Sequence, residues 1–183
     1  MPRIQPTTVE QAPESTRETI KGVKSKMGRV PNLFATLAKS PAALNSYFKQ
    51  KEALATGKLG DKFGESLALA IANFSGCAYC ASAHYAIGEK VGISQEERDL
   101  NRKGQSSDPK TQAAIDLAKS IVETRGWSSD EAFESAKKAG LSEEEILEVL
   151  AITTFNLFTN YANHFIETEN DFPAVELNET LAV

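Results

Sequence analysis

The sequence has little cysteine, no cluster of basic residues and no long apolar run. Its 20 Lys and Arg residues against 25 Asp and Glu residues give a net charge of −5, which argues against binding to nucleic acids or other polyanions. The longest apolar stretch, around residues 67–74, is far shorter than the roughly 20 residues that span a membrane. Residues 1–16 lack the apolar segment of a signal peptide. These absences predict a cytoplasmic protein that binds neither nucleic acid nor membrane.

Only two cysteines are present, Cys77 and Cys80, and together they form a single C-x-x-C pair. A chain of 183 residues buries a core without help from disulfides or metals. A lone pair in a cytoplasmic protein is therefore more often catalytic, redox-active or metal-binding than a structural crosslink.

Segments with the two-residue alternation of β-strands are also absent, whereas helix start signals recur. One kind of signal is a capping residue directly before proline, as in Ser40-Pro41 and Asp108-Pro109. The other is the capping box, which Ser94 forms with Glu97 and Ser142 forms with Glu145. The sequence therefore predicts an all-α fold, a bundle of seven or eight helices joined by short polar turns.

Composition divides the chain into three parts. Residues 1–39 are polar and contain prolines, which predicts an N-terminal arm with one helix near residues 16–27 that packs on the core. Residues 40–172 form the predicted helical domain that contains the C-x-x-C pair. Residues 173–183 are predicted to be an extended tail, either lying on a neighbouring subunit or disordered.

A shift of 83 residues brings two parts of the chain into partial agreement. It aligns the segment ESLA with the segment EVLA, and it aligns Cys77 with Asn160 and Cys80 with Asn163. Either this is a degenerate internal repeat whose second copy has lost its thiols, or two buried helices of similar period agree by chance.

The most informative segment surrounds the cysteines. Ser75 and Gly76 interrupt an apolar helix, and Ser75 is predicted to cap a new helix that starts near Cys77. On that helix, Cys77, Cys80 and His84 fall within an arc of about 60°. The two cysteines can cycle between dithiol and disulfide, the helix N-terminus lowers the pKa of a thiol in its first turn, and His84 can accept the thiol proton.

Two other interpretations of these residues remain open. The cysteines and His84 offer three metal ligands, and Glu65 or His164 could supply a fourth, but a second ligand pair is absent. By spacing alone, Glu65 is either a buried, hydrogen-bonded carboxylate or a solvated residue at a helix start.

His164, the only other histidine, shares its predicted helix with several asparagines. Asn156, Asn160 and either His164 or Asn163 form one polar stripe there, which either lines the active-site cavity or a subunit interface, or only ties down a buried helix.

The pattern E-x11-C-x-x-C-x3-H, formed by Glu65, Cys77, Cys80 and His84, resembles the AhpD-like branch of the carboxymuconolactone decarboxylase superfamily, whose members are all-α alkyl hydroperoxidases. The flanks GRVPNLFATLAKSPAAL and NHFIETENDFP are similar to its uncharacterised peroxidase-related subgroup. The resemblance covers about residues 27–173.

The resemblance implies a role for each residue of the pattern. Cys80 would be the peroxidatic thiolate, Cys77 would resolve the sulfenic acid into a redox-active disulfide, and Glu65 with His84 would form a proton relay. The helix N-terminus instead favours Cys77 as the thiol with the lower pKa, so the order of the cysteines stays open. No metal, flavin or haem is implied, and the implied assembly is a homo-oligomer, a trimer or hexamer.

One position departs from the family pattern. The hydroperoxidases often have a second histidine between the cysteines, where this sequence has Tyr79. A tyrosine with an ordinary pKa near 10 is a poor base at neutral pH, so the relay would be shorter and peroxide turnover weaker.

The sequence thus predicts a thiol peroxidase that acts on organic hydroperoxides or hydrogen peroxide and is reduced by a dithiol protein or a lipoyl-type domain. One alternative is a dithiol–disulfide oxidoreductase that acts on a protein, lipoyl or small disulfide. The other is a non-catalytic oligomeric scaffold or metal-binding protein.

Overall fold

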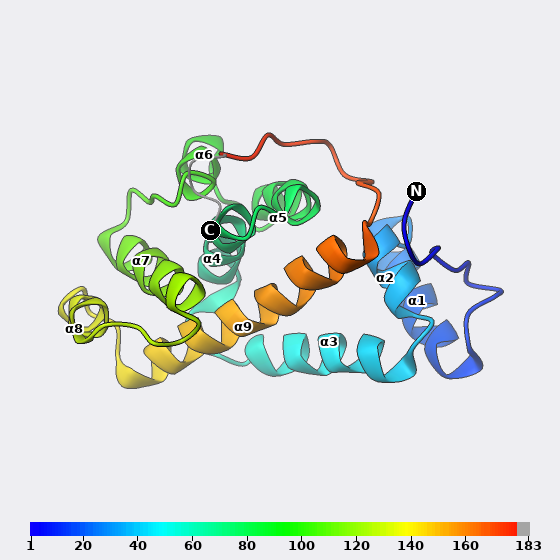
Figure 1. Ribbon diagram of the computed structural model, residues 1–183, viewed down its shortest axis with the longest axis horizontal. Helices are drawn as coiled ribbons and strands as arrows, with labels where there is room; N and C mark the ends of the chain where they lie inside the picture. Colours follow the sequence, from blue (N-terminus) through cyan, green and yellow to red (C-terminus); the bar gives the residue numbers. More distant parts are fainter. Residues whose placement is uncertain (179–183) are drawn as a thin grey trace.

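A computed structural model describes residues 1–178, and within them the chain forms nine helices and no strand (Figure 1). In chain order the helices are α1 (Glu14–Met27), α2 (Asn32–Leu37), α3 (Pro41–Leu54), α4 (Gly60–Phe74), α5 (Ala78–Lys90), α6 (Gln95–Asn101), α7 (Pro109–Thr124), α8 (Asp130–Lys138) and α9 (Glu143–Ile166). The all-α prediction is confirmed. The number of helices exceeds seven or eight because the apolar segment before Ser40 forms the short helix α2.

Capping residues set the start of most helices. The side chains of Ser40, Asp108 and Ser142 each accept a hydrogen bond from the backbone N–H three residues further along the chain. Glu145 completes the capping box at Ser142. Local sequence alone therefore determines where α3, α7 and α9 begin.

The second predicted capping box is wrong. Ser94 accepts the backbone N–H of Glu97, but the Glu97 carboxylate turns away to bind Ser106, Ser107 and Asn101. Burial raises the pKa of Glu97, but the hydrogen bonds from Ser106 and Ser107 outweigh it, and the pKa lies below its ordinary value. The Glu97 carboxylate accepts several hydrogen bonds here instead of the single one in a capping box, and it thereby fixes the loop between α6 and α7.

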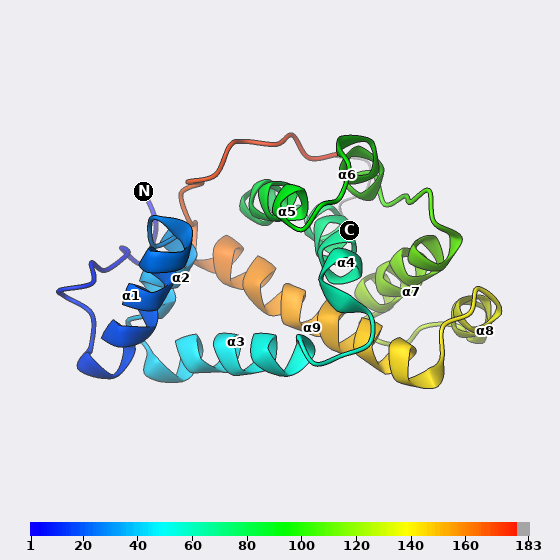
Figure 2. The same ribbon diagram turned by 180° about the vertical axis from the view of Figure 1, so that it is seen from behind.

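Helix α4 runs through the centre of the molecule, and α9 crosses it (Figures 1 and 2). Every residue from Ser66 to Phe74 is buried. A helix that is apolar on all sides requires neighbours on all sides, and α4 packs against α5, α7 and α9. It therefore provides a fixed base for the side chains that it carries.

The core has two parts, one on each side of α4. One part joins α4 to α7, α8 and α9 through residues such as Ile71, Ile115 and Val149. The other joins α4 to α1, α2, α3 and α5, and it includes Leu44, Cys77 and Cys80. No helix within residues 1–178 is both long and apolar enough to cross a bilayer.

The C-terminal segment lies against its own chain. After α9 it runs past α5 to α6 without regular structure (Figure 1). The backbone N–H of Val175 donates to Ser82 Oγ at 3.2 Å, and Arg102 donates to the carbonyl of Glu176 at 2.7 Å. Residues 173–178 are therefore extended, and these contacts hold them to their own chain. Residues 179–183 of the predicted tail lie outside the described residues.

The aligned segments of the suspected repeat differ in shape. The first copy is broken at Ser75 and Gly76, between α4 and α5. The second copy runs without a break through Asn160 and Asn163, inside α9. The sequence agreement is therefore not matched by a repeated break between helices.

Candidate functional site

The junction between α4 and α5 positions the cysteines. Gly76 takes a left-handed conformation with φ of 65°, and Cys77 is extended, with φ of −92° and ψ of 92°. Cys77, rather than Ser75, is the N-cap of α5, and its Sγ accepts the backbone N–H of Cys80 at 3.2 Å. The predicted cap at Ser75 is wrong because Ser75 keeps helical backbone angles at the end of α4, from which its side chain cannot cap the next helix.

Cys77 and Cys80 are joined by a disulfide, and their Cα atoms are 5.3 Å apart. The spacing of three residues across a helix start permits this bond. The two residues are only 1% and 2% exposed. A reagent therefore reaches the sulfurs only through a pocket or after the surrounding segments move.

A pocket between α2, α3, α5 and α9 reaches Cys80 but not Cys77. Its walls are largely apolar and include Leu33, Phe34, Phe155 and Phe172. Concave, mostly apolar pockets with a few polar groups are the usual form of small-molecule sites. The accessible sulfur of the pair is therefore that of Cys80.

His84 and Glu65 form a hydrogen-bonded pair beside this pocket. His84 Nδ1 lies 2.7 Å from Glu65 Oε2, which joins α5 to α4. Their side chains are 18% and 17% exposed. Glu65 is thus a partly buried, hydrogen-bonded carboxylate rather than a solvated residue. Since Glu65 occupies Nδ1, Nε2 is the ring nitrogen left to exchange a proton.

The pair separates two pockets. His84 lines the Cys80 pocket, and it also lines a second pocket between α3, α4 and α9 that includes Glu65, Asp61 and Glu148. The imidazole therefore lies between the sulfur side and a more polar cavity.

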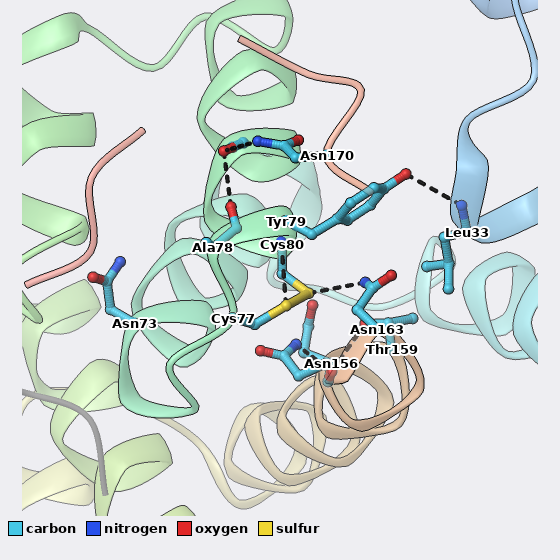
Figure 3. The surroundings of a disulfide bond; sticks show 12 residues. Leu33, Asn73, Cys77, Ala78, Tyr79, Cys80, Asn156, Thr159, Asn163 and Asn170 are labelled. Atoms are coloured by element: carbon cyan, nitrogen blue, oxygen red, sulfur yellow. Dashed lines mark hydrogen bonds between the residues drawn. A yellow bond between two sulfur atoms is a disulfide. The ribbon is translucent and has the colours of Figure 1, made fainter. Parts of the chain in front are cut away.

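Tyr79 lines the Cys80 pocket, but its hydroxyl is engaged elsewhere. It accepts the backbone N–H of Leu33 at 3.3 Å, and its ring meets the Phe172 ring edge to face (Figure 3). Burial raises the pKa of Tyr79 to about 12, against the opposing effects of the Leu33 hydrogen bond and the Arg29 charge. A neutral phenol that holds α2 in place cannot serve as a base near neutral pH.

His164 is not part of the site in this chain. Its side chain is exposed near the end of α9 and lines neither of the two pockets. The prediction that His164 lines the cavity is therefore wrong for the single chain, and the polar stripe continues through Asn163 instead. One residue along a helix turns a side chain by about 100°, enough to move it from the buried face to the surface.

Asn163, one of the two residues with which the polar stripe could end, lies beside the disulfide. Its Nδ2 donates to Cys80 Sγ at 3.2 Å, and the residue is only 4% exposed (Figure 3). The sequence offers two hints, the polar stripe and the alignment of Asn163 with Cys80 after the shift of 83 residues, but neither predicts the contact with Cys80.

The three asparagines of the stripe share an unusual feature. The Oδ1 atoms of Asn156, Asn160 and Asn163 are buried and have no hydrogen-bond partner among the described residues. Asn156 and Asn163 also line the Cys80 pocket. Carboxamide groups buried this deeply are usually satisfied on both sides, which singles out this stripe.

In the described part of the chain, no group of three or more His, Cys, Asp and Glu side chains is arranged to hold a metal ion. The alternative ligand set from the sequence, the cysteines and His84 with Glu65 or His164, does not form such a group.

Comparison with known proteins gives a fold and a family match over part of the chain. Residues 41–102, which include Glu65 and both cysteines, match the Carboxymuconolactone decarboxylase family. A search of curated proteins found no match.

Several solved structures are similar over most of the chain. An uncharacterised peroxidase-related protein from Ralstonia eutropha JMP134, described as an alkylhydroperoxidase AhpD core, is 26% identical with a TM-score of 0.81, over 93% of this chain and 92% of that one. A peroxidase-related protein from Silicibacter sp. TM1040 is 19% identical with a TM-score of 0.78, over 87% and 86%. A cysteine-to-alanine variant of the debrominase Bmp8, bound to 2,3,4-tribromopyrrole, is 20% identical with a TM-score of 0.79, over 92% and 91%. The Silicibacter protein and the Bmp8 variant thus share the fold of this chain.

Proposed function

We propose that this chain is a member of the AhpD-like carboxymuconolactone decarboxylase superfamily and a thiol-dependent peroxidase that reduces hydroperoxides through Cys77 and Cys80. The fold alone does not select this chemistry, because a debrominase shares it. The observation that carries the proposal is the meeting of a disulfide-forming pair with the Glu65–His84 pair at one apolar pocket.

The reaction starts from the reduced pair. The thiolate of Cys80 attacks the terminal, hydrogen-bearing oxygen of the peroxide, an S–O bond forms to give the sulfenic acid, and the O–O bond breaks. The alkoxide leaves with the bonding electrons and takes a proton to become the alcohol. Cys77 then attacks the sulfenic acid at Cys80, releases water and forms the disulfide. The two thiols supply the two electrons that reduce the peroxide to alcohol and water.

The Glu65–His84 pair supplies the proton path. Glu65 fixes the imidazole through Nδ1, so Nε2 accepts the proton of the Cys80 thiol and later returns it to the alkoxide. The carboxylate also stabilises the imidazolium that exists between these two steps. General acid–base assistance of this kind contributes about 10²- to 10⁴-fold to a rate.

The shape of the site favours a small, partly apolar substrate. Because the two cysteines are only 1% and 2% exposed, a small hydroperoxide that enters the Cys80 pocket suits the site better than a bulky disulfide substrate. The apolar walls suit the alkyl group of an organic hydroperoxide, and hydrogen peroxide also fits this chemistry. The reductant, a dithiol protein or lipoyl-type group, must bring its thiol to Cys80 along the same path.

We also propose that the protein is a homo-oligomer of identical subunits in the cytoplasm. Large apolar side chains of α9 are exposed at intervals of three, four and eight residues, at Leu147, Leu150, Phe158, Tyr161 and Phe165. Exposed apolar side chains that gather on one face of a helix typically mark an interface. A second copy of this chain is the partner that agrees with the trimers or hexamers implied by the resemblance.

Titration of the reduced protein with cumene hydroperoxide and with hydrogen peroxide tests the proposed function. We expect both thiols to disappear together, with loss of the mass of two hydrogen atoms, faster than free cysteine reacts. The Cys80→Ser variant should lose this reaction. Thiols that oxidise no faster than free cysteine would contradict a peroxidase and direct attention to small disulfides as substrates.

A further inference from the structure

The two sulfurs of the pair are stabilised by different groups. Cys77 Sγ accepts the backbone N–H of Cys80 at the start of α5, where free N–H groups favour a thiolate. By that measure alone, Cys77 would be the more acidic thiol. However, Cys77 is only 1% exposed and, unlike Cys80, lines neither of the two pockets beside His84.

Cys80 lies in the reverse situation. It lines the substrate pocket, and its Sγ accepts a hydrogen bond from Asn163 Nδ2 at 3.2 Å (Figure 3). This donor belongs to α9, and Asn163 lies 83 residues further along the chain than Cys80.

We propose that Asn163 is a further catalytic residue, whose amide N–H stabilises the thiolate of Cys80 and thereby makes Cys80 the sulfur that attacks the peroxide. The inference rests on the proposed thiol chemistry. It adds a group from α9 to a site otherwise built from α4 and α5.

The orientation of the amide supports this role. A disulfide sulfur and a thiolate only accept hydrogen bonds, so the nitrogen end must face Cys80. Figure 3 shows the nitrogen of Asn163 toward the disulfide and the oxygen on its far side. Because the same contact suits both the oxidised sulfur and the thiolate, Asn163 need not turn during the cycle.

The surroundings of Asn163 increase the effect of one hydrogen bond. Asn163 is 4% exposed and lies in the interior of α9, a helix of 24 residues. A hydrogen bond to an ionised acceptor in a buried site is stronger than one between neutral groups in water. The rigid helix also holds the donor in place before the thiolate forms.

The other titratable groups at the pocket are few. Tyr47 of α3 and Tyr79 and His84 of α5 line it, and Glu65 of α4 acts through His84. Burial raises the pKa of both tyrosines above the ordinary value of 10.0, so they stay neutral through the range used for thiol titration. The described residues of α9 and of the C-terminal segment bring no titratable side chain to this pocket. Comparing variants that all keep His84 therefore isolates Asn163.

The test measures the thiol without peroxide. In a Cys77→Ser background, where serine keeps the N-cap of α5, the rate at which iodoacetamide alkylates Cys80 is followed against pH. We expect Asn163→Ala to move the midpoint upward by about one pH unit, since it removes a hydrogen bond to the charged form. The matched control is Asn160→Ala, because Asn160 is equally buried on α9 but donates to the carbonyl of Asn156.

An unchanged midpoint in Asn163→Ala, or equal shifts in the two alanine variants, would overturn the proposal. If Asn163→Ala does not fold, Asn163→Asp has the same shape and should shift the midpoint further upward, because it places a negative charge beside the thiolate. With Asn163 intact, the Cys80 midpoint must lie below about 8.5, the value for free cysteine. A midpoint at or above that value in the Cys77→Ser protein, with Asn163 still in place, would by itself overturn the proposal.

This result is separate from the outcome for the proposed function. If the midpoint depends on Asn163 but peroxide does not oxidise the thiols, the assignment of the attacking sulfur stands and the peroxidase proposal fails. If peroxide oxidises the thiols but the alkylation midpoint does not depend on Asn163, the peroxidase proposal stands and the role of Asn163 fails. We further expect Asn163→Ala to lower kcat/KM for cumene hydroperoxide at pH 7 by about 10-fold, in line with the smaller thiolate fraction.

Discussion

The Glu65–His84 contact gives one carboxylate of α4 a role that its neighbours lack. Glu65 bonds His84 Nδ1 at 2.7 Å, and the imidazole in turn faces the Cys80 pocket. Asp61 lies one turn earlier on the same helix and lines the second pocket, which provides a matched acidic residue at this site.

The first prediction concerns this pair. Glu65→Gln keeps the shape of the side chain and removes its charge, so the imidazolium loses its stabilising partner. We expect kcat/KM for cumene hydroperoxide to fall by about 10²-fold, as measured in a coupled assay with a saturating thiol reductant. Asp61→Asn should leave the rate within about twofold, since the bond to His84 comes from Glu65. Equal activity of the two variants would remove Glu65 from the proton path.

The second prediction uses the raised pKa of Tyr79. Because burial favours the neutral phenol, the folded protein holds this proton up to a pKa of about 12, against 10.0 when unfolded. The resulting contribution to stability is complete below pH 10 and is lost as the pH rises through about 12. Urea unfolding between these values should therefore show a shallower loss of stability in Tyr79→Phe than in the parent.

The control for this prediction is Tyr161→Phe. Tyr161 is 59% exposed on α9, so it should leave the alkaline slope unchanged. A slope that is the same in the parent and in Tyr79→Phe would show that the Tyr79 phenol ionises as readily in the fold as outside it.

Single residues show where sequence reasoning succeeds and where it stops. Spacing predicted one helical face for Cys77, Cys80 and His84; Cys80 and His84 do line one pocket, whereas Cys77 is the extended N-cap before α5. Spacing left open whether Asn163 or His164 continues the polar stripe of α9, and whether that stripe lines the cavity. Those two depend on the rotation of α9 against α5, which packing sets and the sequence of α9 alone does not contain.

At the scale of elements, the start of α4 depends on a carboxylate from α9. Glu148 accepts the backbone N–H groups of Lys58 and Leu59 at 2.9 and 3.0 Å. No side chain within the α4 segment caps this end, so Glu148 takes that role. The helix that presents Glu65 is therefore held in position by a distant part of the chain.

The third prediction tests this anchor through Gly57. A Cβ at Gly57 would lie 2.7 Å from Glu148 Oε2, so Gly57→Ala must push the carboxylate off its donors. We expect Gly57→Ala to lower the free energy of unfolding by about 1–2 kcal/mol. Gly64 is the matched control, since an added Cβ there meets nothing within 4 Å. Gly64→Ala should be neutral or stabilise by up to about 1 kcal/mol, and a Gly57→Ala variant as stable as Gly64→Ala would contradict the anchor.

The fourth prediction concerns the C-terminal segment as a cover for the disulfide. Phe172 lines the Cys80 pocket and packs on Tyr79, and the backbone of Val175 bonds Ser82. A chain that ends at Asp171 should have its disulfide reduced by dithiothreitol several-fold faster than one that ends at Asn178, because the pocket is opened. Equal reduction rates, measured by free-thiol release, would show that the segment does not limit access.

Elements that begin with a local signal were predictable, and those held by distant partners were not. Ser40, Asp108 and Ser142 bind within their own helices, so their sequence suffices. The path of the C-terminal segment depends on contacts such as that between Val175 and Ser82, 93 residues apart. No periodicity or composition encodes a contact of that kind.

At the scale of the whole molecule, α9 connects the reacting centre to the surface. Its buried face carries Asn163 to Cys80, and its opposite face carries exposed apolar side chains such as Leu147, Tyr161 and Phe165. Subunit contacts on this outer face would stiffen the helix that holds Asn163 in place. Assembly and thiol chemistry are therefore expected to be coupled through one helix.

The fifth prediction follows from that coupling. Tyr161→Glu places a charge in the middle of the stripe without disturbing the core, since the side chain is already 59% exposed. We expect size-exclusion chromatography with light scattering to show a multiple of 19.9 kDa for the parent and a smaller species for this variant. Trp127→Glu is the control, because Trp127 is 87% exposed but lies outside α9, and it should keep the parent mass. A parent that is itself a monomer, or a Tyr161→Glu variant of unchanged mass, would show that the α9 stripe does not join subunits. If the smaller species forms and the pH midpoint for alkylation of its Cys80 equals that of the parent, the packing of α9 on α4 and α5 within one subunit is enough to hold Asn163 in position.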